Sequence, residues 1–307
     1  MRKQVMVIGG SYFAGRVFSI LSSRGEDFHL HVVNRGRFPL NLPNITEYKC
    51  DRHDEETLKN LFPEDLVFDA VVDYCAYEPL DISTIFDMLP GKFKQYIVFS
   101  TASVYDQTQS RPKTEEDGYS TNFPDDAVGQ YMFKKCLLEI ELEQEAEKAG
   151  IPFTILRPTY IYGPYNYAPR ESYYVQRIMQ GLAVPVPKDS KSTSNFVYVT
   201  DTADAARLCI GDERAYNMVF NLACGENISY EDYMKELVAC NGKPFLTREV
   251  TVEDVIAQNI PLPFPLDNDE LYSGELFAKT FDYKYTPFEV GMPKAFNAFK
   301  SIYGPRE

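Results

Sequence analysis

The chain has 307 residues, 44% of them hydrophobic and 25% charged, so it can form one large α/β unit or two unequal domains that share a cleft. Its formal net charge of −14 repels phosphate backbones, which argues against a broad surface for nucleic acid or for an anionic membrane. No apolar run approaches the roughly 18 residues that a membrane span needs. The three histidines have no metal-ligand spacing, so we expect no metal site.

The six cysteines are scattered along the chain and form no C-x-x-C pair. We identify no signal peptide before the first predicted strand. Scattered thiols of this kind fit a reducing compartment, and we therefore expect a cytoplasmic protein.

The first half of the chain alternates short β-rich runs with helical patterns. The predicted strands cover residues 4–9, 29–34, 45–49, 68–73, 95–100 and 153–158. The helical patterns cover residues 13–24, 54–61, 79–89 and 128–149, and the last of them stops at Gly150. This alternation predicts an α/β fold with a doubly wound parallel (Rossmann) sheet, in which ligands bind beyond the carboxyl ends of the strands.

After residue 158 the pattern loosens. Helices are predicted near residues 170–181, 229–240 and 287–302, and two strands, 195–199 and 218–223, are expected to return to the sheet or its edge. We predict a dinucleotide-binding domain over 1–160, with returning segments at about 195–225. Residues 161–194 and 226–307 would form a smaller α/β substrate-binding lobe.

The first strand runs into a loop that contains glycine, GGSYFAG, at residues 9–15. A short turn into a helix leaves N–H groups unpaired at a positive dipole end, where phosphate binds well. Gly9 permits the tight turn and Gly15 lets the helix pack closely, whereas Tyr12 replaces the middle glycine of a G-x-x-G-x-x-G loop. By itself the loop fits a pyrophosphate site or an ordinary strand–turn–helix connection.

The ends of the second and third strands are candidate adenosine contacts. Asn34 and Arg35 follow the second strand, where an acidic residue would suit NAD and an arginine would suit the 2′-phosphate of NADP. A solvent-facing arginine is the alternative. Asp51 ends the third strand and can accept from an adenine amino group, whereas Asp54 is expected to cap the next helix.

Two further stretches, FSTASVYD and GQYMFKKC, carry catalytic chemistry. The first ends a predicted buried strand in hydroxyl groups, among them Thr101. The second places Tyr131 and Lys135 on one face of a helix, because residues i and i+4 are neighbours there. A lysine beside a tyrosine would lower the phenol pKa and make Tyr131 a usable base, with Thr101 holding a substrate hydroxyl. The alternative is a surface aromatic–cation pair.

Together with ILRPTYIYGP and FVYVTDTADA, these stretches resemble the short-chain dehydrogenase/reductase superfamily, and within it the extended NAD-dependent epimerase/dehydratase family, over about residues 4–225. The resemblance implies an NAD(P)-dependent oxidoreductase or epimerase that acts on a secondary alcohol of a sugar or sugar-nucleotide. It implies Thr101, Tyr131 and Lys135 as catalytic residues. With the strand-end residues above, the expected cofactor-binding set is Gly9, Ser11, Tyr12, Phe13, Gly15, Asn34, Arg35, Asp51, Cys75, Ala76, Ser100, Tyr131, Lys135, Pro158 and Thr159.

Three departures from the family pattern change these expectations. The loop resembles a GGTRFxG-like subgroup in which the middle glycine is also replaced, so we expect it to cradle phosphates with Tyr12 turned aside. Sugar-nucleotide 4,6-dehydratases carry an acidic pair where this chain has Ala102 and Ser103, which excludes that dehydration. Many relatives carry a diphosphate-gripping arginine where this chain has Ser194. A nucleoside diphosphate sugar would then need a substitute cation, for which the candidates are Arg170, Arg177 and Lys191.

Two other functions use the same fold. A non-catalytic NAD(P)-sensing regulator would tend to lose the Tyr/Lys pair, which this chain retains. RNA binding is known for some GGTRFxG-like relatives in plastids, but the charge of −14 opposes it. As partners we expect a small sugar derivative, no nucleic acid and no membrane. Helices 79–89 and 128–149 would build a homodimer, although the many charges of EIELEQEAEK are typical of a solvated face.

Overall fold

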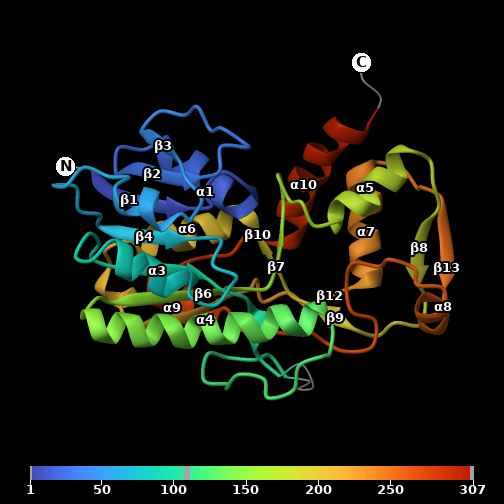
Figure 1. The fold of residues 1–307 in the computed structure, drawn as a ribbon. Coiled ribbons are helices and arrows are strands. Elements are labelled where there is room, and N and C mark those ends of the chain that lie inside the picture. Colours follow the sequence, from blue (N-terminus) through green and yellow to red (C-terminus); the bar gives the residue numbers. More distant parts are fainter. Residues whose placement is uncertain (1, 107–110, 305–307) are drawn as a thin grey trace.

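The computed structural model describes residues 2–106 and 111–304 (Figure 1). At its centre lies a seven-stranded parallel sheet with the order β11-β6-β5-β4-β1-β2-β3. The chain winds outward in both directions from the neighbours β1 and β4, which confirms the doubly wound sheet. The strands are β1 (Lys3–Ile8), β2 (Phe28–Asn34), β3 (Ile45–Lys49), β4 (Ala70–Asp73), β5 (Tyr96–Phe99), β6 (Phe153–Pro158) and β11 (Met218–Leu222).

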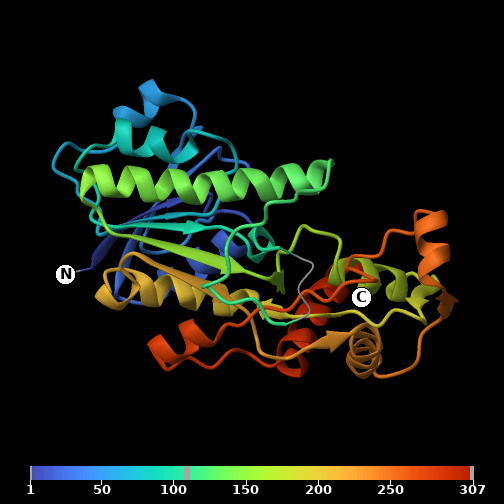
Figure 2. The ribbon, with the colours of Figure 1, turned by 90° about the horizontal axis from the view of Figure 1, so that it is seen from below.

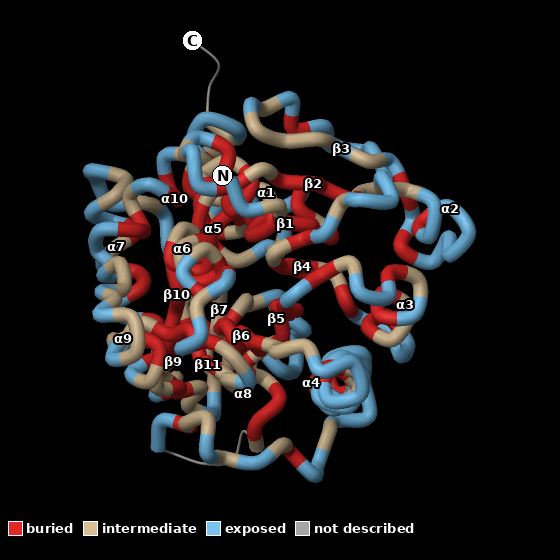
Figure 3. Tube along the Cα trace, turned by 90° about the vertical axis from the view of Figure 1, so that its left-hand side faces the viewer, coloured by how far each residue is buried: buried red, intermediate tan, exposed pale blue. Residues whose placement is uncertain are grey.

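Helices cover both faces of this sheet. One face packs against α1 (Phe13–Ser23) and α6 (Val199–Cys209), and the other against α2 (Glu55–Lys59), α3 (Asp81–Met88) and α4 (Ala127–Ala149). Figure 3 shows the buried strands between these layers and the exposed outer side of α4. The sheet therefore has two apolar cores, as a sheet buried on both faces requires.

The long helix α4 begins and ends where local chemistry dictates. The side chain of Asp126 accepts hydrogen bonds from the N–H groups of Val128 (2.9 Å) and Gly129 (2.8 Å), which satisfies two of the unpaired donors. Gly150 closes the helix in a left-handed conformation with φ of 65°. The predicted end at Gly150 is thus confirmed, and the helix presents Tyr131 and Lys135 in its first three turns.

Much of the chain after β6 lies to the right of the sheet in Figure 1, and Figure 2 shows the same elements from below. Three pairs of short strands lie in this part or at its junction with the sheet: β7 (Tyr160–Tyr162) with β10 (Phe196–Tyr198), β8 (Val184–Pro187) with β13 (Thr247–Val250), and β9 (Thr193–Ser194) with β12 (Ile228–Ser229). The helices of this part are α5 (Glu171–Met179), α7 (Tyr230–Asn241), α8 (Val252–Ala257) and α10 (Phe288–Tyr303), whereas α9 (Glu275–Phe281) lies beside the main sheet.

The two strands expected to return to the sheet behave differently. The predicted strand 218–223 returns as β11 and pairs with β6 at the sheet edge. The prediction for 195–199 was wrong, because among the described strands β10 pairs with β7 and lies outside the main sheet.

Helices α6, α8 and α9 were not predicted from the sequence. In α6 the polar residues Asp201 and Thr202 are buried together with the small apolar ones, so the apolar residues alone do not mark the buried side of the helix. Helix α9 packs against β11 through the edge-to-face contact of Phe277 with Phe220. The division into a larger domain and a smaller lobe stays a prediction. None of the described helices combines the length and the apolar character that crossing a membrane requires.

Candidate active site

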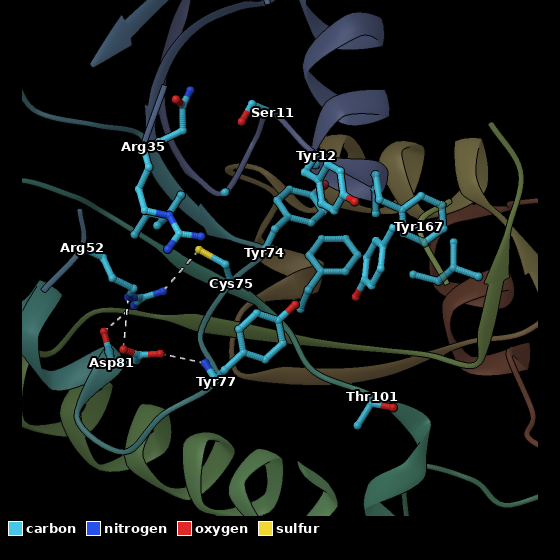
Figure 4. Close-up of a pocket in the computed structure, with 18 of the residues that line it drawn as sticks. Ser11, Tyr12, Arg35, Arg52, Tyr74, Cys75, Tyr77, Asp81, Thr101 and Tyr167 are labelled. Carbon is cyan, nitrogen blue, oxygen red and sulfur yellow. Dashed lines mark hydrogen bonds and ion pairs between the residues drawn. The ribbon is translucent and has the colours of Figure 1, made fainter. Parts of the chain in front are cut away.

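A cleft of about 880 Å³ opens beyond the carboxyl ends of the parallel strands (Figure 4). Its walls come from the loops after β1 to β6, the first turns of α4 and the segment between β7 and α5. All but one of the predicted site residues line it. The exception is Ala76, which is fully buried. The lining members of the prediction are Gly9, Ser11, Tyr12, Phe13, Gly15, Asn34, Arg35, Asp51, Cys75, Ser100, Thr101, Tyr131, Lys135, Pro158 and Thr159.

The loop before α1 leaves no room for side chains at its two outer glycines. Gly9 has φ of +80°, and a Cβ there would lie 2.9 Å from Cys75 Sγ. A Cβ on Gly15 would lie 2.6 Å from the carbonyl oxygen of Gly9. Helix α1 has no side-chain cap and no acidic residue in its first turn. Its N–H groups and positive dipole end therefore face the cleft without a competing carboxylate, which suits a phosphate.

Tyr12 is turned aside from the loop backbone. It has an ordinary extended conformation, with φ of −137°. Its ring stacks between Phe38, from the loop after β2, and Tyr167, from the segment before α5, with centroid distances of 5.1 Å in both cases. The tyrosine therefore replaces glycine without strain at its own position, and the three-ring stack joins the two sides of the cleft mouth. Figure 4 labels two of its members, Tyr12 and Tyr167.

The end of β2 presents two exposed arginine side chains to the cleft. Arg35 was predicted there, and Arg37 joins it. The side chain of Asn34 is already engaged: its Oδ1 accepts from the N–H of Gly36 (2.6 Å) and its Nδ2 donates to Glu47 (3.3 Å). Asn34 thus shapes the turn that carries the arginines.

Beneath the next strand ends lies a buried ion-pair network around Arg52. Its guanidinium bonds both carboxylate oxygens of Asp73 at the end of β4, at 3.0 and 2.9 Å, and also contacts Asp81 Oδ1 at 3.3 Å. Asp81 in turn accepts from the N–H groups of Tyr77 (2.7 Å) and Glu78 (2.9 Å). This network fixes the backbone that forms the cleft wall after β4, as Figure 4 shows.

Asp51 and Asp54 take the separate positions that the sequence predicted. Asp51 lines the cleft, and its Oδ1 accepts from the backbone N–H of His53 at 3.1 Å. Asp54 caps α2, because its Oδ1 accepts from the N–H of Thr57 at 3.1 Å. His53 bridges Asp51 and the Arg52 network, since its Nε2 lies 2.8 Å from Asp81.

Tyr131 and Lys135 both line the cleft beside Thr101, but their electrostatics differ from the expectation. Tyr131 is 38% exposed and hydrogen bonds with Thr101. Burial of its surroundings raises the pKa of Tyr131 to about 12, and the bond to Thr101 lowers it only in part. The prediction that Lys135 depresses this pKa was wrong.

The reason is the position of the Lys135 ammonium group. Its Nζ donates to the carbonyl oxygens of Ala76 (2.7 Å) and Phe99 (3.0 Å), and it lies 6.0 Å from the centroid of the Tyr131 ring. Burial lowers the pKa of Lys135 to about 8. The two carbonyl oxygens hold the amine at the floor of the cleft, below the phenol.

Ser100 is connected to a second buried ion pair. Its Oγ donates to Glu139, which forms a fork with Arg157 at distances of 3.1, 3.0 and 2.5 Å. Both charged side chains are nearly inaccessible. Glu139 belongs to the stretch expected to be a solvated face, so that expectation was wrong at this position. The hydroxyl of Tyr119 also donates to Glu139, at 3.0 Å.

Three cations were proposed to replace the diphosphate-gripping arginine of many relatives. Of these three, Arg170 lines the cleft and the other two do not. Arg177 instead donates to the carbonyl oxygen of Ala183 at 2.8 and 2.6 Å. Lys191 is exposed and outside the lining. Ser194, at the arginine's place, is buried in β9.

Several cleft residues escaped the sequence reasoning. A charged residue next to a strand end, as in the stretch CDRHD, was a usable signal for Arg52. The aromatic and loop residues had no such signal, because their neighbours in space are far away along the chain. The missed lining residues include Arg37, Phe38, Arg52, His53, Tyr74, Tyr77, Glu78, Asp81, Asn166 and Tyr167.

Comparison with known proteins agrees with this architecture. Among solved structures, UDP-glucuronic acid 4-epimerase from Bacillus cereus in complex with NAD superposes with a TM-score of 0.78 at 16% identity, covering 98% of this chain and 99% of that one. UDP-glucose 4-epimerase from Vibrio cholerae is 26% identical over 133 residues, which are 43% of this chain and 38% of that protein.

A protein of Arabidopsis thaliana named chloroplast stem-loop binding protein of 41 kDa b is 30% identical over 257 residues. The match covers 79% of this chain and 64% of that protein, so this chain spans less than two thirds of the length of these curated relatives. The sequence profile of the NAD dependent epimerase/dehydratase family matches residues 5–223. This chain therefore belongs to the NAD dependent epimerase/dehydratase family.

Proposed function

We propose that this protein is an NAD(P)-dependent oxidoreductase or epimerase that acts on a secondary alcohol of a sugar derivative. The observation that carries the proposal is the meeting of Thr101, Tyr131 and Lys135 at the floor of a cleft whose opposite wall is an uncapped helix N-terminus. Family membership supports the same chemistry.

The cleft fits the dinucleotide of this family. The cradle formed by Gly9 and Gly15, which a Cβ would fill, would hold the pyrophosphate against the start of α1. Asp51 would meet the adenine, and Lys135 would bind the nicotinamide ribose, with Pro158 and Thr159 beside the ring. When bound, the nicotinamide would accept a hydride from the substrate carbon or return one to it.

The protein's own contribution is to place and move a proton. Tyr131 would exchange it with the reacting oxygen of the substrate, and Thr101 would hold that oxygen by a hydrogen bond. Because burial raises the pKa of Tyr131 to about 12, its phenol carries a proton at neutral pH. The phenol would thus donate a proton in the direction of carbonyl reduction and, in the direction of alcohol oxidation, would have to lose that proton first.

The test is substitution of the phenol hydroxyl. Tyr131→Phe should reduce turnover on the order of 10²–10⁴-fold, because it removes general acid–base catalysis, and should leave cofactor affinity unchanged. Tyr77→Phe is the matched control, since this ring also lines the cleft, 6.4 Å from that of Tyr131. Turnover would be followed both as net reduction or oxidation of the cofactor and as a change in the configuration of the sugar, with a panel of sugars and sugar derivatives, because an epimerase causes no net change of the cofactor. Full activity of Tyr131→Phe would refute the assigned role.

Between the two cofactors, the arrangement after β2 favours NADP. Arg35 and Arg37 are exposed at the cleft and would meet a 2′-phosphate, whereas the Asn34 side chain is engaged in its own turn. Direct titration with NADPH and NADH measures the preference. Arg35→Gln combined with Arg37→Gln should weaken NADPH binding and leave NADH binding nearly unchanged.

Two other functions remain as competing hypotheses. A pure NAD(P) sensor would bind cofactor but reduce none with any alcohol. RNA binding is favoured by the name of the Arabidopsis relative and opposed by the net charge of −14. A salt-dependent gel shift with a structured RNA would support it over the enzyme.

We also propose a homodimer in the cytoplasm. Phe133, Leu137 and Ile140 are exposed along one side of α4, at the i, i+4 and i+7 spacing that a helix-to-helix contact uses. A second copy would cover them, and Leu137→Glu should convert the dimer to a monomer in light-scattering measurements. All six cysteines are free thiols, which fits a reducing compartment.

A further inference from the structure

The cleft is short on its substrate side. Among the described residues that line it, none comes from beyond Arg170, so the later part of the C-terminal region contributes nothing to its walls. The substrate end consists of Thr101, Tyr131 and the segment from Asn166 to Arg170. A ligand that extended far from the reacting hydroxyl would have to lie outside this lining.

The place where relatives grip a diphosphate is closed in this chain. Ser194 is 4% exposed, pairs with Ile228 of β12 and bridges to Glu270 on its other side. The hollow beside it, lined by three serines and by apolar and tyrosine side chains, has about 10 Å³ of space. That is room for about one water molecule and not for a diphosphate.

Arg170 is the cation that the substrate end does offer. Its guanidinium lies 4.7 Å from the centroid of the Tyr160 ring and donates one hydrogen bond, from Nη1 to the carbonyl oxygen of Ile161 at 3.3 Å. Within residues 2–106 and 111–304, no ion pair of Arg170 is found, and the N–H groups of its guanidinium make no other hydrogen bond to the protein.

Other charges near Arg170 do not neutralise it by contact. The Glu171 carboxylate is occupied by the N–H of Gly163 (2.8 Å) and by Asn166 (3.1 Å). Glu270 hydrogen bonds with Tyr160. The positive charge of Arg170 also acts on the phenol of Tyr131, which places both groups at the same end of the cleft. An anion held by Arg170 would therefore lie close to the reacting hydroxyl.

We propose that Arg170 binds an oxyanion of the substrate, and that the substrate is a small anionic sugar, either a sugar phosphate or a sugar acid, without a nucleoside. The guanidinium presents several parallel N–H donors, which match a phosphate or carboxylate in a two-point contact. This inference rests on the proposed function and narrows its substrate class.

The experiment measures binding to the NADPH-saturated protein by calorimetry, with four probes: glucose 6-phosphate, glucuronate, glucose and UDP-glucose. We expect at least one of the two anionic sugars to bind more tightly than either glucose or UDP-glucose. Which of the two binds separates a phosphate from a carboxylate. Arg170→Gln should weaken that binding roughly 10- to 100-fold, as the loss of charge-assisted bonds predicts. Lys191→Gln, which removes an exposed cation outside the lining, is the matched control and should change nothing.

Three results would overturn the inference. The first is tighter binding of UDP-glucose than of either anionic sugar. The second is that the wild-type and Arg170→Gln proteins bind the anionic sugars with equal affinity, and the third is that the wild-type protein binds neither anionic sugar. If Arg170→Gln fails to fold, Arg170→Lys is the second variant. It keeps the positive charge but lacks the parallel N–H donors of the guanidinium, so its affinity for the anionic sugar should fall by less. The proposed function is tested separately, by NADPH affinity and by the Tyr131→Phe experiment. Preferred binding of a nucleotide sugar would therefore contradict this inference without contradicting the proposed function.

Discussion

The two ends of the cleft are held in place by different interactions. At the cofactor end, the wall after β4 is fixed by a buried guanidinium, Arg52, bonded to carboxylates on the strand end and at the start of α3. At the substrate end, the segment before α5 is held by Glu171, a buried carboxylate whose partners are an amide side chain and a backbone N–H. One end depends on paired full charges and the other on hydrogen bonds between a charge and neutral groups.

This difference indicates which end tolerates change. Removing one member of a buried ion pair leaves an uncompensated charge, so a substitution in the Arg52 network should lower the free energy of unfolding strongly. Exchanging a carboxylate for an amide among neutral partners preserves much of the bonding. A fixed cofactor wall beside an adaptable substrate wall is the arrangement that lets one fold serve several substrates.

The largest expected effect comes from breaking the Arg52 pair. Asp73→Asn should lower the free energy of unfolding by about 3–5 kcal/mol, because it leaves Arg52 charged and buried. It should also weaken NADPH binding. Glu171→Gln is the matched substitution at the other end and should cost about 0.5–1.5 kcal/mol. Urea unfolding of both variants measures the contrast, and equal losses would contradict it.

A second effect concerns pH and Lys135, which lies between the two ends. Burial lowers its pKa from 10.5 to about 8, so between these values the unfolded chain binds the proton and the folded protein does not. The contribution of Lys135 to the free energy of unfolding should therefore rise as the pH increases from about 8 to 10.5, by about 3 kcal/mol in total. The measurement is the difference in unfolding free energy between wild type and Lys135→Met from pH 7 to pH 10.5. A difference that does not change with pH would show that the lysine is not desolvated.

Gly15→Ala tests the cofactor cradle. The added Cβ would lie 2.6 Å from the Gly9 carbonyl oxygen and 3.0 Å from Gly10 Cα, so α1 must move away from the strand end. We expect a loss of roughly 1–3 kcal/mol in stability together with weaker NADPH binding. Gly225→Ala is the control, because a Cβ there meets nothing within 4 Å. NADPH affinity equal to that of wild type in Gly15→Ala would argue against a cradle at this turn.

The smallest effect is expected at the aromatic stack that joins the two ends. Tyr12→Ala and Tyr167→Ala should each speed release of NADPH, since a ring pair contributes about 0.5–1.5 kcal/mol beyond its burial. The double variant should release cofactor scarcely faster than either single variant, because both remove the same contact. Stopped-flow fluorescence of NADPH gives the rates. Additive effects would mean that the rings act independently.

Much of the fold and the placement of Tyr131 and Lys135 was predictable from the sequence, because both are encoded in short patterns. Alternating β and α periods gave the parallel sheet, and the cap at Asp54 and the end at Gly150 follow from local hydrogen bonding. The spacing of Tyr131 and Lys135 placed them on one helical face. Each of these features depends on residues within a few positions of one another.

The tertiary structure decided what lies between distant segments. Arg52 contacts partners 21 and 29 residues away, and Tyr12 stacks on Tyr167. A pattern within a short stretch of sequence cannot predict such contacts. Glu139 looked solvated by composition, yet Arg157 and Ser100 enclose it. The pKa of Tyr131 likewise follows from burial and from where the Lys135 amine is held. Sequence determines which groups are available, and only packing determines which of them lose water and meet.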